Sequence, residues 1–264
     1  MGRRIGIITG SGLYDLSFLK DRQIEKVDTP FGSADVALGK LGGIEAAAIA
    51  RHGEGHRLLP NMINHRANMM ALKMLGAYAV YATSVVGALS LDVPLASAIL
   101  FEDLYFPENR LPNGELCTVF TLPGEAGRGH YIFDRPFSEE MRKAAADAAR
   151  ELGISVVVGG AYGHVNGPRF NSRAEIKQLQ SAGVIAVSQT SGPEAVLAGE
   201  LEMAYQLIGF AVDYANGVSS APTPIEELNA NLEASKLLFP KLIERALRKL
   251  DRGSIGPCGT MYRF

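Results

Sequence analysis

Short apolar and β-branched runs alternate along the chain with stretches in which apolar residues recur every three or four positions. The short runs predict buried strands, and the helical spacing predicts amphipathic helices. The expected strands are 4–9, 34–38, 44–50, 79–84, 96–101, 154–161, 184–187 and 206–213. The expected helices are 60–75, 138–152, 172–181, 193–203 and 224–250. This alternation predicts an α/β fold with a central mixed, largely parallel sheet flanked by helices.

The segment 105–135 differs from the rest of the chain because it is rich in Pro, Gly and charged residues. It predicts a long loop, and such loops in compact folds are usually functional. No internal repeat and no long linker divides the sequence. We therefore expect residues 1–264 to form a single domain.

The composition narrows the choice of partners. Apolar residues make up 47% of the chain, the formal net charge is −2, and Trp is absent. Lys and Arg form no basic stripe, which argues against nucleic acid as a partner. The two cysteines, Cys117 and Cys258, lack CxxC spacing and predict reduced thiols in a cytoplasmic protein. We expect no signal peptide and no membrane span, since no run approaches ~18 uncharged apolar residues.

A glycine turn, Gly10-Ser11-Gly12, directly follows the first expected strand. Such a turn exposes backbone N–H groups and here adds one hydroxyl, which suits an anion such as phosphate. A dinucleotide fingerprint is disfavoured because Asp15 stands at the third glycine position, and a P-loop because no Lys follows. An anion site built around Ser11 and a plain strand-to-helix turn both remain open.

Four more polar groups follow expected strands. Arg51 and His52 come after the third strand, Ser84 ends the fourth, and Thr190 follows the seventh. Arginine offers planar donors that fit an oxyanion, and ligands gather at strand carboxyl ends in open α/β sheets. Each group alone is better explained by ordinary loop and cap chemistry, but the four together form a stronger pattern. A metal site from His52 and His56 is rejected, because no further ligand cluster lies at suitable spacing.

Two further residues suit a flat heterocyclic ligand. Phe170 follows Gly167-Pro168-Arg169 and can stack on such a ligand, although core packing is the commoner fate of Phe. Asp213 ends the last expected strand. A carboxyl there can hydrogen-bond a heterocycle, or donate a proton if burial raises its pKa. Its plainer role is to cap a loop.

As a set, these segments resemble the trimeric nucleoside phosphorylases, and within them the 5′-methylthioadenosine phosphorylase branch. The segments that carry the resemblance are Gly10-Ser11-Gly12-Leu13-Tyr14, Arg51-His52-Gly53 with His56, 60–68, Gly167-Pro168-Arg169-Phe170, Pro193-Glu194 and Asp213-Tyr214. The resemblance implies a nucleoside phosphorylase-like fold. It implies phosphorolysis, in which inorganic phosphate attacks C1′ of a purine nucleoside and releases the base. No metal or organic cofactor is expected.

The resemblance also assigns roles by position. Phosphate would be held by Ser11, Arg51, His52, Ser84 and Thr190. The nucleoside would lie against Val85, His130, Asn166, Phe170, Gln189, Asp213, Tyr214 and Ala215, and the start of the last helix near Thr223, Ile225 and Leu228 would border its 5′ substituent. Asp213 would be the catalytic residue and would favour protonation of the base at N7. A homotrimer or a dimer of trimers is implied, with His130 reaching a neighbouring subunit's pocket.

Some positions depart from the family pattern. Asn166 replaces a Glu, Gln189 a Met, Ala215 an acid and His65 a Tyr, and Asn216 lies beside Ala215. The retained Asp213 favours a 6-aminopurine, because an acid can accept from the amino group, so we expect 5′-methylthioadenosine as substrate. Ala215 and Asn216 leave a 6-oxopurine nucleoside, such as methylthioinosine or inosine, as the alternative. A hypothesis of a different functional class is a homologue that binds a nucleoside without converting it. An oxidoreductase is disfavoured by Asp15 at the third glycine position.

Overall fold

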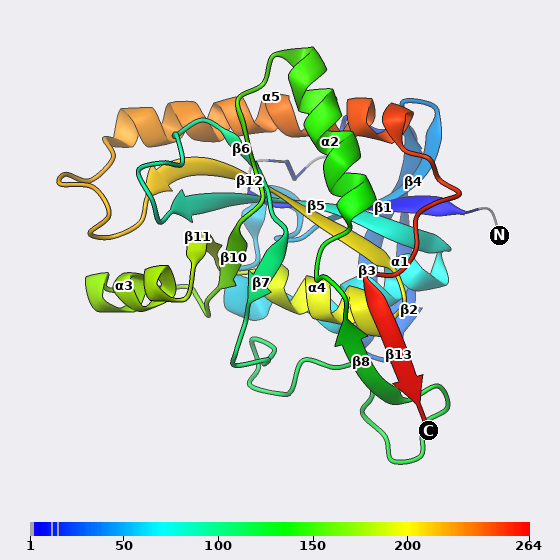
Figure 1. Cartoon of the computed structure of the whole chain (residues 1–264). Coiled ribbons are helices and arrows are strands. Elements are labelled where there is room, and N and C mark those ends of the chain that lie inside the picture. The colour runs from blue at the N-terminus through cyan, green and yellow to red at the C-terminus, as the bar shows by residue number, and fades with distance from the viewer. Residues whose placement is uncertain (1–2, 12, 15) are drawn as a thin grey trace.

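The computed structural model describes residues 3–11, 13–14 and 16–264. Gly12 and Asp15 lie outside the described residues, so the expectations that rest on them stay predictions. The described chain forms a large mixed, mostly parallel sheet with helices on both faces (Figure 1). The predicted α/β fold class is thereby confirmed.

The centre of the sheet consists of four parallel strands: β4 (Ile44–Ala50), β1 (Arg4–Thr9), β5 (Ala77–Ala88) and β12 (Ala204–Tyr214). They lie side by side in this order. Parallel strands present their carboxyl ends at one edge of a sheet. Polar residues that follow these strands are therefore neighbours in space, although they are far apart in the sequence.

Further strands extend this centre on both sides. Beyond β4 lie β3 (Gly32–Leu41) and β2 (Lys20–Thr29), both antiparallel to their neighbours. Beyond β5 lie β11 (Val184–Ser188), β10 (Ala161–His164) and β7 (Asp103–Tyr105). Strands β6 (Ala98–Leu100) and β9 (Val156–Val158) branch from β12. A separate two-stranded sheet joins β8 (Gly129–Phe133) to β13 (Gly259–Arg263).

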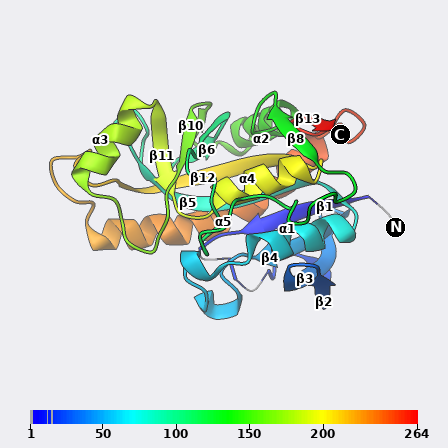
Figure 2. The same ribbon diagram turned by 90° about the horizontal axis from the view of Figure 1, so that it is seen from below.

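Helices cover both faces of the sheet (Figure 2). On one face lie α1 (His65–Met74) and α4 (Ser191–Glu200), and on the other α2 (Glu139–Leu152) and α5 (Ile225–Lys249). The short helix α3 (Arg173–Ser181) follows β10. Successive residues of a strand point to opposite faces of the sheet. Ile7 therefore packs in the core on the α5 side, and Ile8 packs in the core on the α4 side. The site strands are thus fixed from both faces.

The predicted strand 154–161 is wrong as a single element. It is two strands, β9 and β10, which pair with different partners. Between them Gly159 and Gly160 have φ values of 102° and 86°, a conformation that favours glycine. The two glycines redirect the chain from one branch of the sheet to the other.

Several other boundaries differ from the prediction. The edge strand β2 was not predicted. Its first seven residues, which precede Val27, are all exposed, and their sequence shows no alternation of apolar and polar residues. The first predicted helix starts at His65, because Pro60–Met62 form a separate 3₁₀ turn. The predicted loop 105–135 contains β8. Ser138 caps α2 and Gly153 ends it in the left-handed region, as predicted.

Candidate functional site

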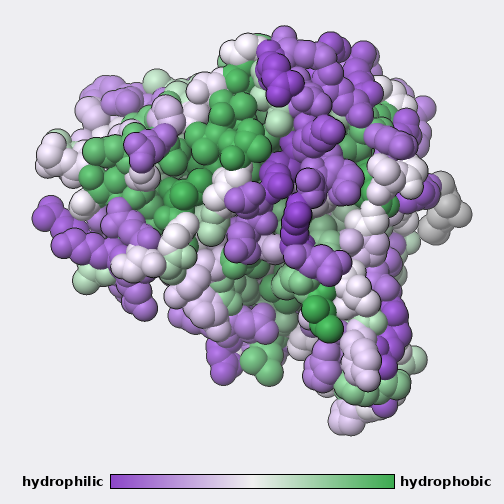
Figure 3. All heavy atoms as spheres, in the orientation of Figure 1, coloured by the Kyte–Doolittle hydropathy of each residue, from purple (hydrophilic) through white to green (hydrophobic). Residues whose placement is uncertain are grey.

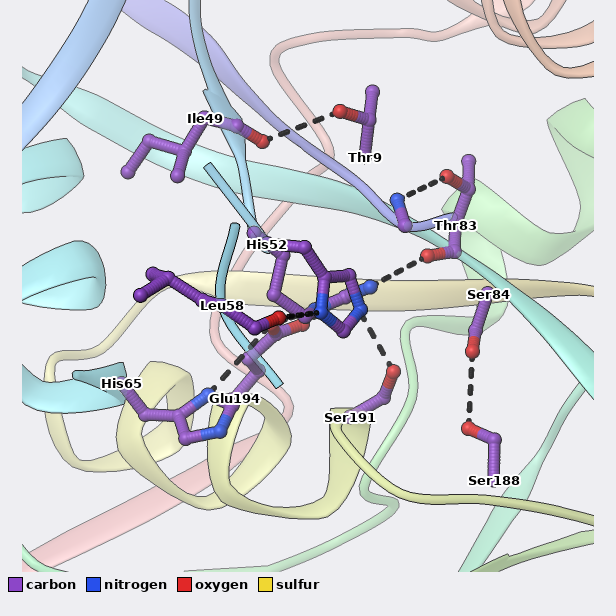
Figure 4. A network of polar contacts seen from close by, with 12 residues as sticks. Thr9, Ile49, His52, Leu58, His65, Thr83, Ser84, Ser188, Ser191 and Glu194 are labelled. Carbon is purple, nitrogen blue, oxygen red and sulfur yellow. Dashed lines mark hydrogen bonds and ion pairs between the residues drawn. The ribbon is translucent and has the colours of Figure 1, made fainter. Parts of the chain in front are cut away.

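The carboxyl ends of β1 and β4 meet β5 beside Thr83, inside that strand, and Arg51 directly follows β4 there. Figure 4 shows polar contacts of this region, including those of Thr83, Ser84 and Glu194. The Arg51 backbone N–H donates to the carbonyl of Thr9 at 3.0 Å, and the Gly10 N–H donates to the Thr83 hydroxyl at 3.2 Å. These bonds join the glycine turn to the strands on either side of it. Three predicted phosphate residues, Arg51, Ser11 and Ser84, therefore belong to one small cluster. The prediction that Ser84 ends its strand was wrong, because β5 continues to Ala88.

Arg51 is buried, with 1% of its surface exposed, and its guanidinium is held by protein groups. Its Nε and Nη2 donate to the two carboxylate oxygens of Glu194 at 2.5 and 2.8 Å. Its Nη1 donates to the Thr83 carbonyl at 2.9 Å, and Nη2 also reaches the Ser191 hydroxyl at 3.5 Å. Of the five N–H groups, one on Nη1 has no partner among the residues that the structure describes.

That Nη1 atom faces the glycine turn. A Cβ added to Gly10 would lie 2.8 Å from the Thr83 carbonyl oxygen and 3.0 Å from Arg51 Nη1. Only glycine allows the turn to approach this closely. The remaining Nη1 hydrogen is thus beside the turn in which Ser11 supplies a hydroxyl.

Glu194 holds Arg51 in place from the first turn of α4. Its carboxylate also accepts from the Tyr205 hydroxyl at 2.8 Å, and only 1% of the residue is exposed. Burial alone would lower the pKa of Arg51, but the adjacent Glu194 charge raises it, so the guanidinium stays charged. The two charges are opposite, so the pair is electrically neutral as a unit. Both side chains are buried and joined by two hydrogen bonds, which keeps the charges together.

Two histidines beside this pair are uncharged. Burial, followed by the Arg51 charge, lowers the pKa of His52 to about 4 and that of His65 to about 3. His52 Nδ1 lies 2.9 Å from the carbonyl of Leu58, which can only accept. A neutral His52 therefore donates from Nδ1 and has an unprotonated Nε2. The resemblance placed His52 among the residues that hold phosphate. The geometry leaves its Nε2 as a hydrogen-bond acceptor, because Nδ1 donates to Leu58.

Ser84 is connected to the start of α4 by a chain of hydroxyl groups. Its Oγ lies 2.9 Å from Ser188 Oγ, which lies 2.7 Å from the Tyr162 hydroxyl oxygen. Ser84 donates to the carbonyl of Val85 at 3.0 Å, so Ser188 donates to Ser84 and Tyr162 donates to Ser188. The Tyr162 hydroxyl oxygen also accepts from the Ser191 N–H at 3.2 Å.

Thr190 immediately precedes α4 and is 4% exposed. Its side chain does not cap the helix. The first-turn N–H groups of a helix carry partial positive charge and attract anions. Thr190 and the start of α4 therefore face the strand-end cluster from the side opposite the glycine turn, because Ser191 and Glu194 both contact Arg51.

Asp213 lies near the end of β12, beside Gly87 of β5. A Cβ added to Gly87 would lie 3.4 Å from Asp213 Oδ1 and 3.6 Å from the Ala215 methyl group. Burial raises the pKa of Asp213 to about 6. Among the described residues, no cation forms an ion pair with this carboxyl. A carboxyl in this state can both donate and accept a proton near neutral pH.

Apolar surface lies around the carboxyl ends of β5 and β12 (Figure 3). The start of α5 is attached there, since the Tyr214 N–H donates to the Thr223 hydroxyl at 3.3 Å. Ile225 is 61% exposed at the first turn of this helix. Phe170, in the loop between β10 and α3, is 82% exposed. The aromatic ring predicted to contact a flat ligand is therefore not part of the core.

His130 is the one predicted site residue that lies far from this cluster. It belongs to β8, which packs on the C-terminal end of α4, where a Cβ on Gly199 would contact Tyr131. The phosphate residues lie at the opposite end of α4, about 15 Å away along the helix. The His130 ring contacts Phe264 instead. Within one chain, His130 does not join the other predicted residues.

Four residues of the site were not predicted: Glu194, Tyr205, Tyr162 and Ser188. Glu194 was quoted only as part of a motif, and its buried role has no local sequence signal. Within the described residues, no group of three or more His, Cys, Asp or Glu side chains could hold a metal ion. No helix in the described part of the chain is long and apolar enough to cross a membrane.

Comparison with known proteins identifies the family. Residues 4–248 match the phosphorylase superfamily. The chain is 40% identical over 255 residues to a probable 6-oxopurine nucleoside phosphorylase of Thermococcus kodakarensis, covering 91% of this chain and 92% of that one. It is 32% identical over 267 residues to an S-methyl-5′-thioadenosine phosphorylase of Geobacter sulfurreducens, covering 100% and 91%.

The fold leads to the same family. A methylthioadenosine phosphorylase from Schistosoma mansoni, solved in complex with adenine, superposes with a TM-score of 0.83 at 26% identity. The match covers 94% of this chain and 92% of that chain. The resemblance inferred from the motifs is therefore confirmed. The chain is an enzyme that belongs to the phosphorylase superfamily.

Proposed function

We propose that this enzyme cleaves 5′-methylthioadenosine with inorganic phosphate, giving adenine and 5-methylthioribose 1-phosphate. One observation carries the proposal: hydrogen-bond donors at the end of β1, within β5 and at the start of α4 share this part of the sheet with a half-buried carboxyl whose pKa is raised to about 6, since Asp213 pairs with Gly87, three residues after Ser84 on β5. The hydrogen-bond donors suit an oxyanion, and the Asp213 carboxyl suits a leaving base that needs a proton.

Phosphate would bind between the glycine turn and the start of α4. The free Nη1 hydrogen of Arg51, the Ser11 and Thr190 hydroxyls and the Gly192 N–H in the first turn of α4 are donors, because the Ser191 N–H already donates to Tyr162 and Pro193 has none. The Ser84 hydrogen can turn from the Val85 carbonyl toward the anion, because Ser188 continues to donate to Ser84. His52 Nε2 would accept the hydrogen that a phosphate dianion carries.

The bound phosphate then acts as the nucleophile. One of its oxygens forms a bond to C1′ while the C1′–N9 bond breaks and its electron pair moves onto the purine. Positive charge develops on the sugar and negative charge on the base. The phosphate stabilises the first, and the two substrates are held together in one site. We expect no metal and no organic cofactor to take part.

Asp213 would receive the charge that develops on the base. A protonated carboxyl has one donor and one acceptor, so it can donate to N7 and accept from the 6-amino group of adenine at the same time. A 6-oxopurine presents two acceptors on that edge. Asn216, the nearby amide that could donate to O6, already donates to the Asn171 carbonyl at 2.7 Å. This arrangement favours a 6-aminopurine.

The alternative substrate is a 6-oxopurine nucleoside. It is favoured by the 40% identity to a relative with that name. For the 5′ substituent, the exposed Ile225 and the half-buried Leu228 at the start of α5 offer an apolar surface, which suits a methylthio group better than a hydroxyl. Val85 and Gln189 would border the ribose.

We further propose a cytoplasmic homotrimer, or a dimer of trimers. His130 lies about one helix length from the site of its own chain, so it could border a nucleoside only in a neighbouring subunit's pocket. It lines a surface cavity of about 710 Å³ together with Tyr131 and Phe133. Sedimentation of the purified protein would measure the number of subunits.

The proposal is tested by incubating the protein with phosphate and a panel of 5′-methylthioadenosine, adenosine, methylthioinosine and inosine. We expect fastest release of free base from 5′-methylthioadenosine, matched by equal formation of the sugar 1-phosphate, and none without phosphate. Equal or faster cleavage of the 6-oxopurine nucleosides would contradict the proposed substrate and favour the 6-oxopurine alternative. Nucleoside-dependent thermal stabilisation without any base release would identify a non-catalytic binding protein.

A further inference from the structure

Phe170 is held from both sides by amide side chains that belong to other parts of the fold. The carbonyl before it, on Arg169, accepts from Gln189 Nε2 at 2.9 Å. The carbonyl after it, on Asn171, accepts from Asn216 Nδ2 at 2.7 Å. The Phe170 carbonyl between them accepts from Arg169 Nη1 at 3.2 Å. A ring that is 82% exposed therefore stands on a backbone in which three successive carbonyl groups are bonded.

The two amides come from the strand ends that build the rest of the site. Gln189 directly follows β11 and precedes Thr190, and Asn216 follows β12 three residues after Asp213. Each therefore connects the loop of Phe170 to a rigid element that also carries a proposed substrate contact. The position of the ring is coupled to the phosphate side by one amide and to Asp213 by the other.

Gln189 also lies directly against the start of the loop. A Cβ added to Gly167 would lie 2.1 Å from Gln189 Oε1 and 2.6 Å from its Cδ. Any side chain at position 167 would displace the amide group. The Gly167-Pro168 segment and Gln189 are thus fitted to each other, which makes the contact specific rather than a random surface bond.

The outer part of the loop has its own bonds. Arg169 donates to both carboxylate oxygens of Glu175 at 2.7 and 2.9 Å, and Glu175 forms a capping box with Ser172. Asn166 donates to Glu108 at the other end. These groups are exposed, and surface pairs of this kind contribute little individually. Arg169 also donates to the Phe170 carbonyl, but that bond stays within the loop. The amides of Gln189 and Asn216 connect the backbone beside the ring to the ends of β11 and β12.

We infer that Gln189 and Asn216 are positioning residues that hold Phe170 ready to stack on the purine. The inference rests on the proposed function. A loop ordered before the ligand arrives loses less conformational entropy on binding, which strengthens binding without a new contact. Gln189, which departs from the family pattern, and Asn216, which lies beside the departure at Ala215, would thus contribute to base binding through the loop instead of touching the base.

The test compares Gln189→Met and Asn216→Asp, which remove a donor at nearly constant size. We expect each to raise the KM for the nucleoside about three- to tenfold, the effect of one hydrogen bond, while the KM for phosphate changes less than twofold. Gln178→Met, an exposed amide on α3, is the control and should change neither value. Equal changes in both KM values would overturn the inference.

A double-mutant cycle with Phe170→Ala separates positioning from direct contact. If the amides act through the ring, adding Asn216→Asp to Phe170→Ala should raise the nucleoside KM no further, and Gln189→Met, which also borders the ribose, should raise it less than it does in the wild type. Full additivity would overturn the inference. Hydrogen exchange of peptide 166–172 in the ligand-free protein provides a readout independent of catalysis. It should accelerate in both single variants, and unchanged exchange would refute the positioning role even if the proposed reaction fails.

Discussion

The Asp213 carboxyl should make the stability of this enzyme depend on pH in a predictable direction. Burial raises its pKa from 3.8 to about 6. The native state therefore binds this proton more tightly than the unfolded chain does. Between about pH 4 and pH 6 the free energy of unfolding should fall as the pH rises, and above that window the contribution should be constant.

The magnitude follows from the same two values. The pKa of Asp213 in the folded protein is about two units above its value in the unfolded chain. This difference lowers the free energy of unfolding above pH 6 by about 3 kcal/mol relative to pH below 4, and partial contact of the carboxyl with water makes this an upper bound. Asp213→Asn keeps the shape and removes the charge. At pH 8 it should stabilise the protein by about 1–3 kcal/mol, or raise its Tm by roughly 2–10 °C. At pH 4.5 the gain should shrink to about a third.

Urea denaturation at the two pH values measures this directly. Asp21→Asn, at an exposed position on the edge strand β2, is the matched control and should show no difference between them. The same Asp213→Asn protein should lose about 10²- to 10⁴-fold in kcat on aminopurine nucleosides. A variant that is less stable than the wild type at pH 8, or a gain that is equal at both pH values, would refute the reasoning.

Three further predictions follow from the site. Glu194→Gln leaves Arg51 buried without its counter-charge, so it should lower the free energy of unfolding by about 3–5 kcal/mol in urea titrations; a change below 1 kcal/mol would contradict the pair's role. Ser84→Ala should raise the KM for phosphate about three- to tenfold and leave the nucleoside KM unchanged. The kcat/KM for the nucleoside should decline above about pH 6, where free Asp213 loses its proton, and a profile identical to that of Asp213→Asn would remove Asp213 from this role.

The strand ends could be predicted from the sequence because each is a local signal. An apolar run followed by Gly10 or Arg51 marks both a strand and the residue after its carboxyl end. The predicted end at Ser84 was wrong, because β5 continues through Ser84 to Ala88. The break at Gly159 and Gly160 could not be predicted, since a run of valines followed by glycines is compatible with one strand or two. Only the pairing of β9 and β10 with different partners decides the matter.

The supports of the site could not be predicted, because their partners are distant in the sequence. Glu194 is 143 residues from Arg51, and Ser188 is 104 residues from Ser84. An acidic residue in the first turn of a helix has an ordinary explanation in the helix dipole. Its burial against an arginine becomes visible only when β4 and α4 are seen together. The amide contacts of Gln189 and Asn216 are hidden in the same way.

These long-range contacts change what the charge of the site means. Arg51 alone would present a full positive charge to phosphate, which would bind the anion tightly but also neutralise it. Because Glu194 balances Arg51, and because His52 and His65 are uncharged, these four residues have no net charge. Binding then depends on hydrogen bonds and on the start of α4. In the proposed reaction the phosphate would retain its negative charge beside C1′, where it is needed to stabilise the positive sugar.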